Sequence, residues 1–425
     1  MVKFRRHSFL LVALLVAGLV IGTGVVSAAR LTLYSWEGVD GIAEQQQIAE
    51  NYMKENPGVE LVAQSPPGTS SDYLQKVLTQ VAAGSPPDVF QIGDGDVAPF
   101  AREGRITNLT PFVTGPNGID PEDFLAGPLE YGKYNGEYYA IPKDFSPLVM
   151  YYNKAIFDEA GIEYPNDDWT WEDFEAAARA LTVKSGNRTT RYGATFGNLA
   201  ETRFMIPFIL SNNGDVMNPE ATRATGYLDS DATIEAIERI AGLIREGVIA
   251  RKSSMEALGG GDQMFVSERT AMHFTGIWPM ATQFEPAGLD FGTAVLPAME
   301  RPASILFWAG YAMFDTVEDK ELAWDVLKYF TGPEGQSIMA RTRMTANKQA
   351  AENVGALNDE RLVTFYKLAD YAEVPFDLKG TPEGVIARDF FVRALEEIFY
   401  TDADVREVFT RTAREIDEEI ARQGF

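Results

Sequence analysis

Residues 31–96 read LTLYSWEGVDGIAEQQQIAENYMKENPGVELVAQSPPGTSSDYLQKVLTQVAAGSPPDVFQIGDGD, and this stretch decides the fold. Short apolar runs alternate with longer stretches in which apolar residues recur at helical spacing, for example Tyr73, Val77 and Val81. Asn-Pro-Gly and Gly-Ser-Pro-Pro sequences end the two helical stretches. The pattern predicts strands at 31–35, 59–63 and 88–92 and helices at 41–55 and 72–83. This alternation of strand and helix is typical of a parallel sheet in an α/β lobe.

The three predicted strands are followed by polar and aromatic side chains, and ligands of such sheets bind at the carboxyl ends of the strands. These candidate ligand contacts are Trp36, Glu37, Thr69, Ser70, Asp94 and Asp96. Two ordinary explanations stay open, because Ser70 can cap the helix that follows it and Asp-Gly is a common turn. We expect the set to form one side of a binding site.

The rest of the chain predicts more α/β structure. Asn135-Gly136 is a type I′ turn signal within an aromatic hairpin, and Thr170-Trp-Glu-Asp resembles a capping box that opens a helix. Further strands are predicted at 148–152, 270–274 and 305–314. Further helices are predicted at 171–181, 232–246, 320–330, 334–340, 360–371 and 387–399, with a charged helix closing the chain. The length suggests two or three domains.

Composition excludes several classes of protein. The 425 residues include no cysteine, which excludes disulfides, thiolate metal sites, a cysteine nucleophile and a lipoprotein anchor. His273 is the only histidine beyond His7, so a His-rich metal site is excluded. We expect His273 to be partly buried and hydrogen-bonded rather than catalytic. The net charge of −25 argues against nucleic-acid and anionic-membrane partners. No cofactor or metal is expected.

The first 28 residues have the pattern of a signal peptide. Lys3, Arg5 and Arg6 precede an uncharged run at 9–26, and Val26-Ser27-Ala28 offers the small residues that a signal peptidase reads. A retained single-pass anchor is the alternative, since about 18 apolar residues is near the minimum for spanning. With no cysteine for a lipid tether, we expect a periplasmic protein.

Six segments, taken together, resemble one protein family. They are Tyr34-Ser-Trp-Glu; Gly84-Ser-Pro-Pro-Asp-Val-Phe; Asn135-Gly-Glu-Tyr-Tyr-Ala-Ile-Pro with Tyr151-Tyr-Asn-Lys; Trp169-Thr-Trp-Glu-Asp-Phe; Arg269-Thr-Ala-Met-His-Phe-Thr-Gly-Ile-Trp; and Ala323-Trp-Asp-Val-Leu-Lys-Tyr-Phe-Thr-Gly-Pro-Glu-Gly-Gln. In this order they resemble the family 1 extracellular solute-binding proteins of ABC importers, the maltose-binding and glycerol-phosphate-binding class. The resemblance spans nearly all of the chain beyond the signal segment.

The resemblance implies a two-lobed periplasmic binding protein fold of the class II type. It places hinge crossings between the lobes near 144–149, near 304–308 and around Asn347. The N-terminal lobe would then comprise 29–146 and 306–347, and the C-terminal lobe 147–305 and 348–425. Composition alone does not indicate this discontinuity.

Tryptophans at strand ends are candidates for stacking on a sugar, whose apolar C–H face needs a flat aromatic surface. Trp36, Trp278 and Trp308 each lie at the end of a predicted strand. Gly276 and Gly310 lie beside the last two, and a glycine there would let a ligand approach the backbone. Core packing is the alternative, but the resemblance favours Trp278 and Trp308 as ligand contacts. Trp169, Trp171 and Trp324 are expected to pack in the interior.

Charged candidates complete the predicted site. Asp144 lies at a predicted crossing and could accept paired hydrogen bonds from vicinal hydroxyls, or be a solvated loop acid. Arg343 matches a family position that often reaches the cleft, although a surface arginine is an equal alternative. Tyr311 and Asn212 are weaker candidates. The sequence Gly259-Gly-Gly-Asp262 lacks the Gly-Lys-Ser/Thr of a phosphate loop and predicts a flexible connection.

The sequence therefore predicts a monomeric, non-enzymatic receptor that captures a sugar or oligosaccharide by hinge closure and delivers it to the permease subunits of an ABC importer. A secreted glycoside hydrolase is one alternative, because it too would hold aromatics and paired carboxylates in a cleft. The same fold binding glycerol phosphate or a polyamine is another. A phosphate would need several basic groups, and Arg343 and Arg203 are the candidates.

Overall fold

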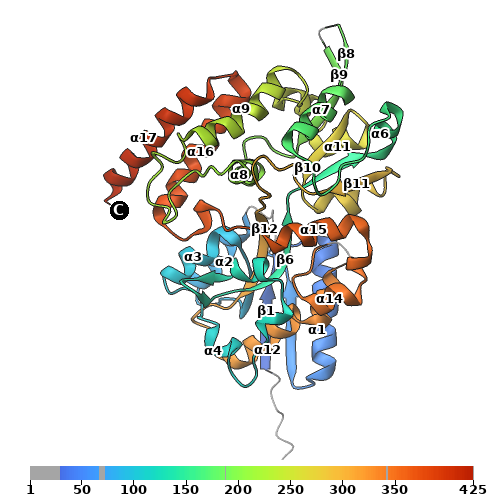
Figure 1. Cartoon of the computed structure of the whole chain (residues 1–425). Helices are drawn as coiled ribbons and strands as arrows, with labels where there is room; N and C mark the ends of the chain where they lie inside the picture. The colour runs from blue at the N-terminus through green and yellow to red at the C-terminus, as the bar shows by residue number, and fades with distance from the viewer. Residues whose placement is uncertain (1–28, 67–71, 187, 341–342, 425) are drawn as a thin grey trace, which may run out of the picture.

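Two five-stranded sheets, each flanked by helices, form the two lobes of the molecule (Figure 1). The computed structural model describes residues 29–66, 72–186, 188–340 and 343–424, so the predicted signal segment lies outside it. The predicted two-lobed α/β fold is confirmed. Among the helices of these residues, none combines the length and apolar character that a membrane crossing requires.

The first sheet has the order β2-β1-β3-β12-β6. Its strands are β1 (Ala29–Tyr34), β2 (Val59–Gln64), β3 (Val89–Gly93), β6 (Ile141–Pro147) and β12 (Leu306–Ala312). β1 pairs in parallel with β2 and β3, whereas β12 runs antiparallel to β3 and β6. The run Val89 to Ile92 is buried throughout, as expected for a strand covered by helices on both faces.

The helices that accompany the first sheet come from both ends of the chain. They are α1 (Val39–Glu55), α2 (Tyr73–Ala82), α3 (Asp94–Arg102), α4 (Thr110–Val113), α5 (Ala126–Glu130), α12 (Lys320–Thr331), α13 (Pro333–Met339), α14 (Lys348–Asn353) and α15 (Glu360–Asp370). The hairpin of β4 (Lys133–Tyr134) and β5 (Glu137–Tyr138) turns at Asn135-Gly136, where both residues have positive φ. A loop after β3 was expected, but Asp94 and Asp96 form the first turn of α3.

The second sheet has the order β11-β7-β10-β9-β8. Its strands are β7 (Val149–Asn153), β8 (Val183–Ser185), β9 (Arg188–Phe196), β10 (Thr270–Thr275) and β11 (Phe291–Ala294). The helices around it are α6 (Lys154–Ala160), α7 (Trp171–Leu181), α8 (Thr202–Ser211), α9 (Asp231–Arg245), α10 (Lys252–Ala257), α11 (Gly261–Val266), α16 (Pro382–Thr401) and α17 (Val405–Gln423). The predicted capping box at Thr170 and Asp173 is present at the start of α7. Strand β9 and helix α8 were not predicted.

The chain passes from the first sheet to the second between β6 and β7, where a single residue, Leu148, separates the two strands. It returns between β11 and β12, across 295–305. Helix α15 packs against both β6 and β11, so the segment after Asn347 touches both sheets before α16 joins the second lobe. The lobe limits 29–146 with 306–347 and 147–305 with 348–425 stay a prediction.

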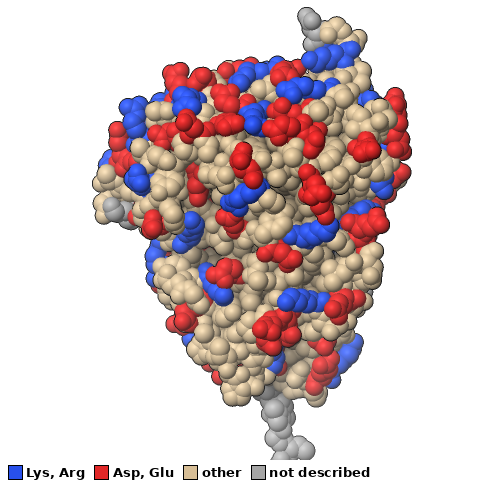
Figure 2. All heavy atoms as spheres, viewed as in Figure 1, with Lys and Arg blue, Asp and Glu red and all other residues tan. Residues whose placement is uncertain are grey.

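The interior holds the tryptophans that were expected there, and the surface carries mixed charges. Trp171 and Trp324 are at most 1% exposed, which confirms their expected packing role. On the face that Figure 2 shows, Lys and Arg side chains are interspersed with Asp and Glu and do not gather into one basic patch. The two lobes therefore offer no single charged field on that face.

Candidate functional site

A cavity of about 470 Å³ lies between the two sheets. The first lobe contributes side chains from the ends of β1, β6 and β12, and the second contributes the segment after β10. The lining residues are Trp36, Glu37, Gly41, Gln91, Asp144, Phe145, Ser146, Ile277, Trp278, Thr282, Phe307, Trp308, Ala309 and Arg343. The volume is in the range of small-molecule sites. Six predicted site residues are thus brought together: Trp36, Glu37, Asp144, Trp278, Trp308 and Arg343.

The three tryptophans of the cavity differ in how they are held. Trp278 is 42% exposed and meets the Phe307 ring edge-on, with ring centres 5.0 Å apart. Trp36 is half-buried and packs edge-on against Tyr73. Trp308 is only 5% exposed, and its Nε1 donates to the Pro128 carbonyl oxygen at 2.8 Å. Trp278 therefore offers the largest free aromatic surface, whereas Trp308 forms a fixed wall.

Gly276 and Gly310 have a different role from the one expected. A Cβ on Gly276 would lie 2.0 Å from Cζ3 of Trp278, and a Cβ on Gly310 would lie 2.3 Å from Cη2 of Trp308. Each glycine thus makes room for the indole two residues away. The expectation that they leave the backbone open to a ligand is wrong on that side, because the ring occupies the space.

Three charged side chains, Glu37, Asp144 and Arg343, line one side of the cavity, and Lys143 and Glu44 contact them from outside the lining. We call these five residues the Glu37 cluster. The Lys143 ammonium, with a fully buried side chain, lies 2.7 Å from Glu37 Oε1 and also contacts Asp144 Oδ2. Arg343 Nη2 lies 2.5 Å from Glu37 Oε2, and its Nη1 lies 2.6 Å from Glu44 Oε2. Its Nε is 3.5 Å from Asp144 Oδ2. Three carboxylates therefore share two cations.

The protonation state of Glu37 follows from this arrangement. Burial raises the pKa of Glu37, but the neighbouring Lys143 and Arg343 outweigh burial and bring the pKa to about 2. Burial lowers the pKa of Arg343, and Glu37 and Asp144 reverse that effect, so its pKa ends above the ordinary value. Glu37 is therefore ionised at neutral pH and is a hydrogen-bond acceptor, not a proton donor.

Other predicted residues lie outside the cavity lining. Asp94 Oδ1 accepts a hydrogen bond from Arg203 Nη2 of α8 at 2.8 Å, a contact between the two lobes. Asp96 is half-buried, and burial together with Asp94 raises its pKa to about 6. Tyr311 is fully buried behind the wall, so it is not a ligand contact in this structure. Thr69 and Ser70 lie outside the described residues.

Two further expectations concern buried polar residues. His273 is fully buried; its Nδ1 lies 2.8 Å from Thr195 Oγ1 and its Nε2 lies 2.8 Å from Asp262 Oδ1. The expected hydrogen bonds of His273 are thus present, but the side chain is fully rather than partly buried. Asn212 is 6% exposed and donates from Nδ2 to the Ala232 carbonyl oxygen, which holds the chain end of α8 rather than a ligand.

Several lining residues were missed from the sequence. Gln91 lies inside the apolar strand β3, where its Oε1 accepts from Ser35 Oγ at 2.8 Å and its Nε2 points to Glu37 Oε1 at 3.4 Å. A polar residue within a buried strand was the available signal. Phe307 and Ser146 carried no such signal. Phe307 resembles an ordinary core residue in the sequence, and Ser146 accepts a hydrogen bond from the backbone N–H of Ile277 at 2.9 Å, a contact that the sequence does not show.

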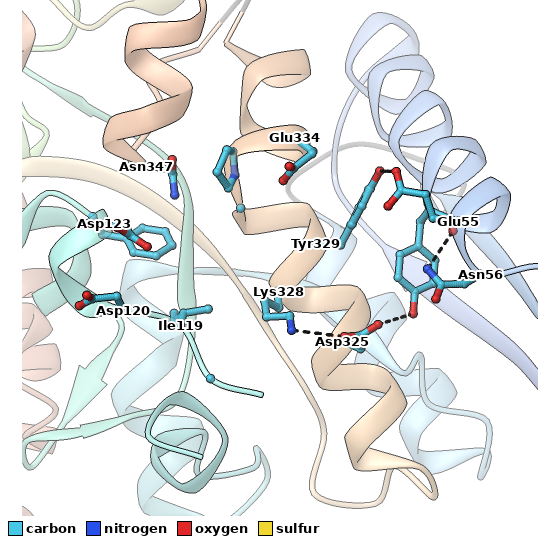
Figure 3. Close-up of a pocket in the computed structure, with 15 residues that line it drawn as sticks. Glu55, Asn56, Ile119, Asp120, Asp123, Asp325, Lys328, Tyr329, Glu334 and Asn347 are labelled. Atoms are coloured by element: carbon cyan, nitrogen blue, oxygen red, sulfur yellow. Dashed lines mark hydrogen bonds and ion pairs between the residues drawn. The ribbon is translucent and has the colours of Figure 1, made fainter. Parts of the chain in front are cut away.

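A second cavity of about 450 Å³ lies wholly in the first lobe, between the end of α1, helix α12 and the start of α13 (Figure 3). Its aromatic rings are already engaged: Tyr52 and Tyr329 pack edge-on, and their hydroxyls bond to Asp325 and Glu55 at 2.9 Å. All of its described lining residues belong to the first lobe. A ligand there would not join the lobes, so the cavity between the sheets is the better candidate.

The comparisons with known proteins agree with this geometry. Residues 37–337 match the family described as bacterial extracellular solute-binding protein. A putative binding protein of Brucella abortus is 23% identical, over 94% of this chain and 97% of its own. UgpB from Mycobacterium tuberculosis in complex with glycerophosphocholine superposes with a TM-score of 0.79 at 19% identity, covering 93% of this chain and 100% of that one. The sugar-binding protein MalE from Xanthomonas citri gives 0.79 at 18%, covering 93% and 98%. The resemblance seen in the sequence is confirmed, and the chain belongs to the bacterial extracellular solute-binding proteins.

Proposed function

We propose that this protein is a receptor that captures a sugar or oligosaccharide between its two lobes and delivers it, unchanged, to the permease subunits of an ABC importer. The observation that carries the proposal is the pairing of Trp278, exposed across the cavity, with the ionised wall of the Glu37 cluster. An indole face suits the C–H face of a sugar ring, and carboxylates accept hydrogen bonds from its hydroxyls.

The fold does not separate a sugar from a phosphate ester, since relatives of equal TM-score are described with glycerophosphocholine and as sugar-binding. The charges of the cavity favour a sugar over a phosphate ester. Arg343 is the only cation among the described lining residues, and it already contacts Glu37, Glu44 and Asp144. A phosphate would have to displace these carboxylates. A polyamine would need carboxylates without a cation beside them, and Glu37 and Asp144 are already neutralised by Lys143 and Arg343.

Hydrolysis is also disfavoured by the charges of the wall. A glycoside hydrolase needs one carboxylic acid that keeps its proton until it protonates the leaving oxygen. The pKa of Glu37 is near 2, lowered rather than raised, so this carboxylate carries no proton at neutral pH. Incubation with oligosaccharides should therefore release no new reducing ends, and turnover would overturn the assignment as a pure receptor.

The mechanism follows from where the lining residues come from. Trp36, Asp144 and Arg343 belong to the first lobe, and Ile277 and Trp278 to the second, so a bound ligand touches both. A ligand that contacts both lobes stabilises the closed form; taking a protein from about 99% open to about 99% closed requires about 10⁴-fold preference. The closed form then presents both lobes to the permease. We place this action in the periplasm, with the protein acting as a monomer after removal of residues 1–28.

Tryptophan fluorescence tests the proposal. A saturating sugar should change the emission of the wild type, and Trp278→Phe should remove most of that change and weaken binding about tenfold, because an indole–sugar contact is lost. Trp169→Phe, outside the cavity, is the matched control and should retain both. Native mass spectrometry of the purified protein should show a retained saccharide mass. If no sugar in a broad panel alters the emission or the melting temperature, the carbohydrate proposal fails.

A further inference from the structure

The cavity of the first lobe, between the end of α1, helix α12 and the start of α13, carries an excess of negative charge (Figure 3). The carboxylates that line it come from α1, from segment 120–123 and from α12 and α13, which meet only in the folded chain. We call this space the acidic cavity. Its described charged lining residues are Glu55, Asp120, Asp123, Asp325 and Glu334, with Lys328 as the one cation.

The lysine of the acidic cavity is already engaged. Lys328 Nζ contacts Asn117 Oδ1 and lies 3.4 Å from Asp325 Oδ1. Asp325 Oδ2 also accepts a hydrogen bond from the Tyr52 hydroxyl at 2.9 Å. Lys328 and Asp325 therefore neutralise each other, and the charge of the other four carboxylates is left over.

These four carboxylates contact no cation within the described part of the chain. Asp120 Oδ1 accepts from the backbone N–H two residues further on, and Glu55 Oε1 accepts from the Tyr329 hydroxyl, both at 2.9 Å. Asp123 and Glu334 are exposed, and their carboxylates have no hydrogen bond or ion pair among the described residues. Two carboxylates are thus open to a cation that enters the cavity.

The lysines nearest in sequence to these acids are directed to other partners. Lys54 Nζ donates to Asn51 Oδ1 at 3.2 Å, and Lys348 Nζ donates to the Glu122 carbonyl oxygen at 2.8 Å. Neither lysine is among the described lining residues. The acidic cavity therefore attracts cations and repels anions.

A buried amide supplies the second feature of the acidic cavity. Asn347 is 2% exposed, and its Oδ1 accepts from the backbone N–H of Ala350 at 3.0 Å as the N-cap of α14. This bond fixes the orientation of the amide, so Nδ2 points away from α14 and toward the cavity (Figure 3). Nδ2 donates no hydrogen bond among the described residues. A buried donor without a partner costs free energy, which a ligand with an acceptor would recover.

The charges and the free donor together select the chemistry of the occupant. Carboxylates bind guanidinium or ammonium groups, which donate hydrogen bonds and do not accept them. Asn347 Nδ2 requires an acceptor in the same ligand, and a polyamine has none. A basic stretch of polypeptide has both, because its side chains are cations and its backbone carbonyl oxygens are acceptors.

We propose that the acidic cavity is a docking site for a basic, extended segment of a partner protein. An arginine or lysine side chain of that segment enters the space lined by Asp123 and Glu334, and one of its backbone carbonyl oxygens accepts from Asn347 Nδ2. All of the described lining residues belong to the first lobe, so the partner contacts one lobe only. The site is separate from the cavity between the lobes, and the two can be occupied together.

Fluorescence anisotropy with a fluorescein-labelled tetra-arginine peptide, at physiological ionic strength, tests the inference. The wild type should bind the peptide, and Asp123→Asn combined with Glu334→Gln should weaken binding about tenfold, because two charge-assisted contacts are lost. Glu300→Gln combined with Glu407→Gln removes the same charge from exposed carboxylates of the second lobe. This matched control should keep the affinity within about twofold of the wild type, because distant exposed charges are screened.

Asn347→Ser separates a peptide from a small cation. Serine can still cap α14, but it lacks the amide donor. The affinity for the peptide should fall about fivefold, as expected for one lost hydrogen bond, while the affinity for spermidine stays within about twofold. The melting temperature should match that of the wild type, because the cap is retained.

Three results would overturn the docking site. The first is a wild type that does not bind the peptide. The second is equal weakening by the two double variants, which would mean a general attraction between a basic peptide and an acidic protein. The third is spermidine that binds as tightly as the peptide, with Asn347→Ser sparing both. None of these results bears on the solute receptor proposed above, because none of the substituted residues lines the cavity between the lobes.

Discussion

Two charged clusters flank the space between the lobes, and they are built in opposite ways. In the Glu37 cluster every carboxylate contacts a cation, and the pKa of Glu37 is near 2. The second, which we call the Arg203 cluster, comprises Asp94, Asp96, Glu201, Arg203 and Asp377. There Arg203 contacts Asp94 across the lobes and Glu201 within its own.

The Arg203 cluster leaves groups unpaired. Both carboxylate oxygens of Asp377, which is 4% exposed, and Nε of Arg203 lack a hydrogen-bond partner among the described residues. Burial raises the pKa of Asp377 to about 6, which Arg203 only partly offsets. The Glu37 cluster therefore keeps a fixed charge that suits holding a ligand, whereas the Arg203 cluster joins the lobes and changes its charge in a mildly acidic range.

The largest effect is expected from removing the cation at the centre of the Glu37 cluster. Lys143→Met leaves Glu37 and Asp144 close together without their shared ammonium, and breaking such a buried pair should lower the free energy of unfolding by about 3–5 kcal/mol. Urea denaturation measures it. Lys133→Met, which removes an ion pair of 2.7 Å to Glu130 on the outer hairpin, is the control and should cost less than about 1 kcal/mol. Equal losses of stability in the two variants would show that the buried ion pairs of the Glu37 cluster do not differ from a surface ion pair.

A smaller effect is expected at the joint. Arg203→Met removes the contact between the lobes and leaves Asp94 without its partner, which should lower the free energy of unfolding by about 2–3 kcal/mol. In a double-mutant cycle with Asp94→Asn the two losses should not add, because the pair acts as a unit. Arg179→Met, which removes contacts with Glu175 and Glu246 on the surface of the same lobe, should cost less than about 1 kcal/mol. Full additivity would mean that the pair does not join the lobes.

The smallest effect, and the one with an unusual sign, concerns pH. The folded pKa of Asp377 is about 6, above its ordinary value of 3.8, so the folded protein binds the proton more tightly than the unfolded chain. Its burial penalty is fully present above pH 6 and disappears as pH falls toward 4. Asp377→Asn should therefore raise the free energy of unfolding at pH 7.5 by about 1–2 kcal/mol and change little at pH 4.

A carboxylate of the opposite kind serves as the control for that measurement. The Arg361 side chain, by hydrogen bonding, lowers the pKa of Asp359. Its stabilising contribution is present above its ordinary pKa and is lost as pH falls further, so Asp359→Asn should destabilise at pH 7.5. If both variants shift stability in the same direction, the assignment of Asp377 as a penalised buried carboxylate is wrong.

The parts of the fold that sequence predicts are those written in local patterns. Strands β1 to β3 and helices α1 and α2 follow from apolar periodicity and from Pro-Gly punctuation, and Trp36 and Trp278 follow from their place after strands. Helix α8 was missed because its apolar run with Pro207 carries little helical periodicity. The sequence therefore did not indicate where Arg203 of this helix lies. Lys143 was missed because nothing local shows that its ammonium lies between two carboxylates. Pairings between distant segments depend on side-chain direction, which periodicity does not give.

The indole rings that pack on Gly276 and Gly310 restrict which substitutions homologous sequences can accept. Gly276 and Trp278 form one structural unit, since a methyl group on the glycine would lie 2.0 Å from the ring and the ring would have to move. A sequence that replaces Trp278 by a small residue is free to replace Gly276 as well, whereas one that keeps the ring is not. In an alignment of sequences with this fold, positions 276 and 278 should covary, whereas position 310 should stay glycine whatever residue stands at 308, because a Cβ there would also lie 2.8 Å from the Ile141 carbonyl oxygen.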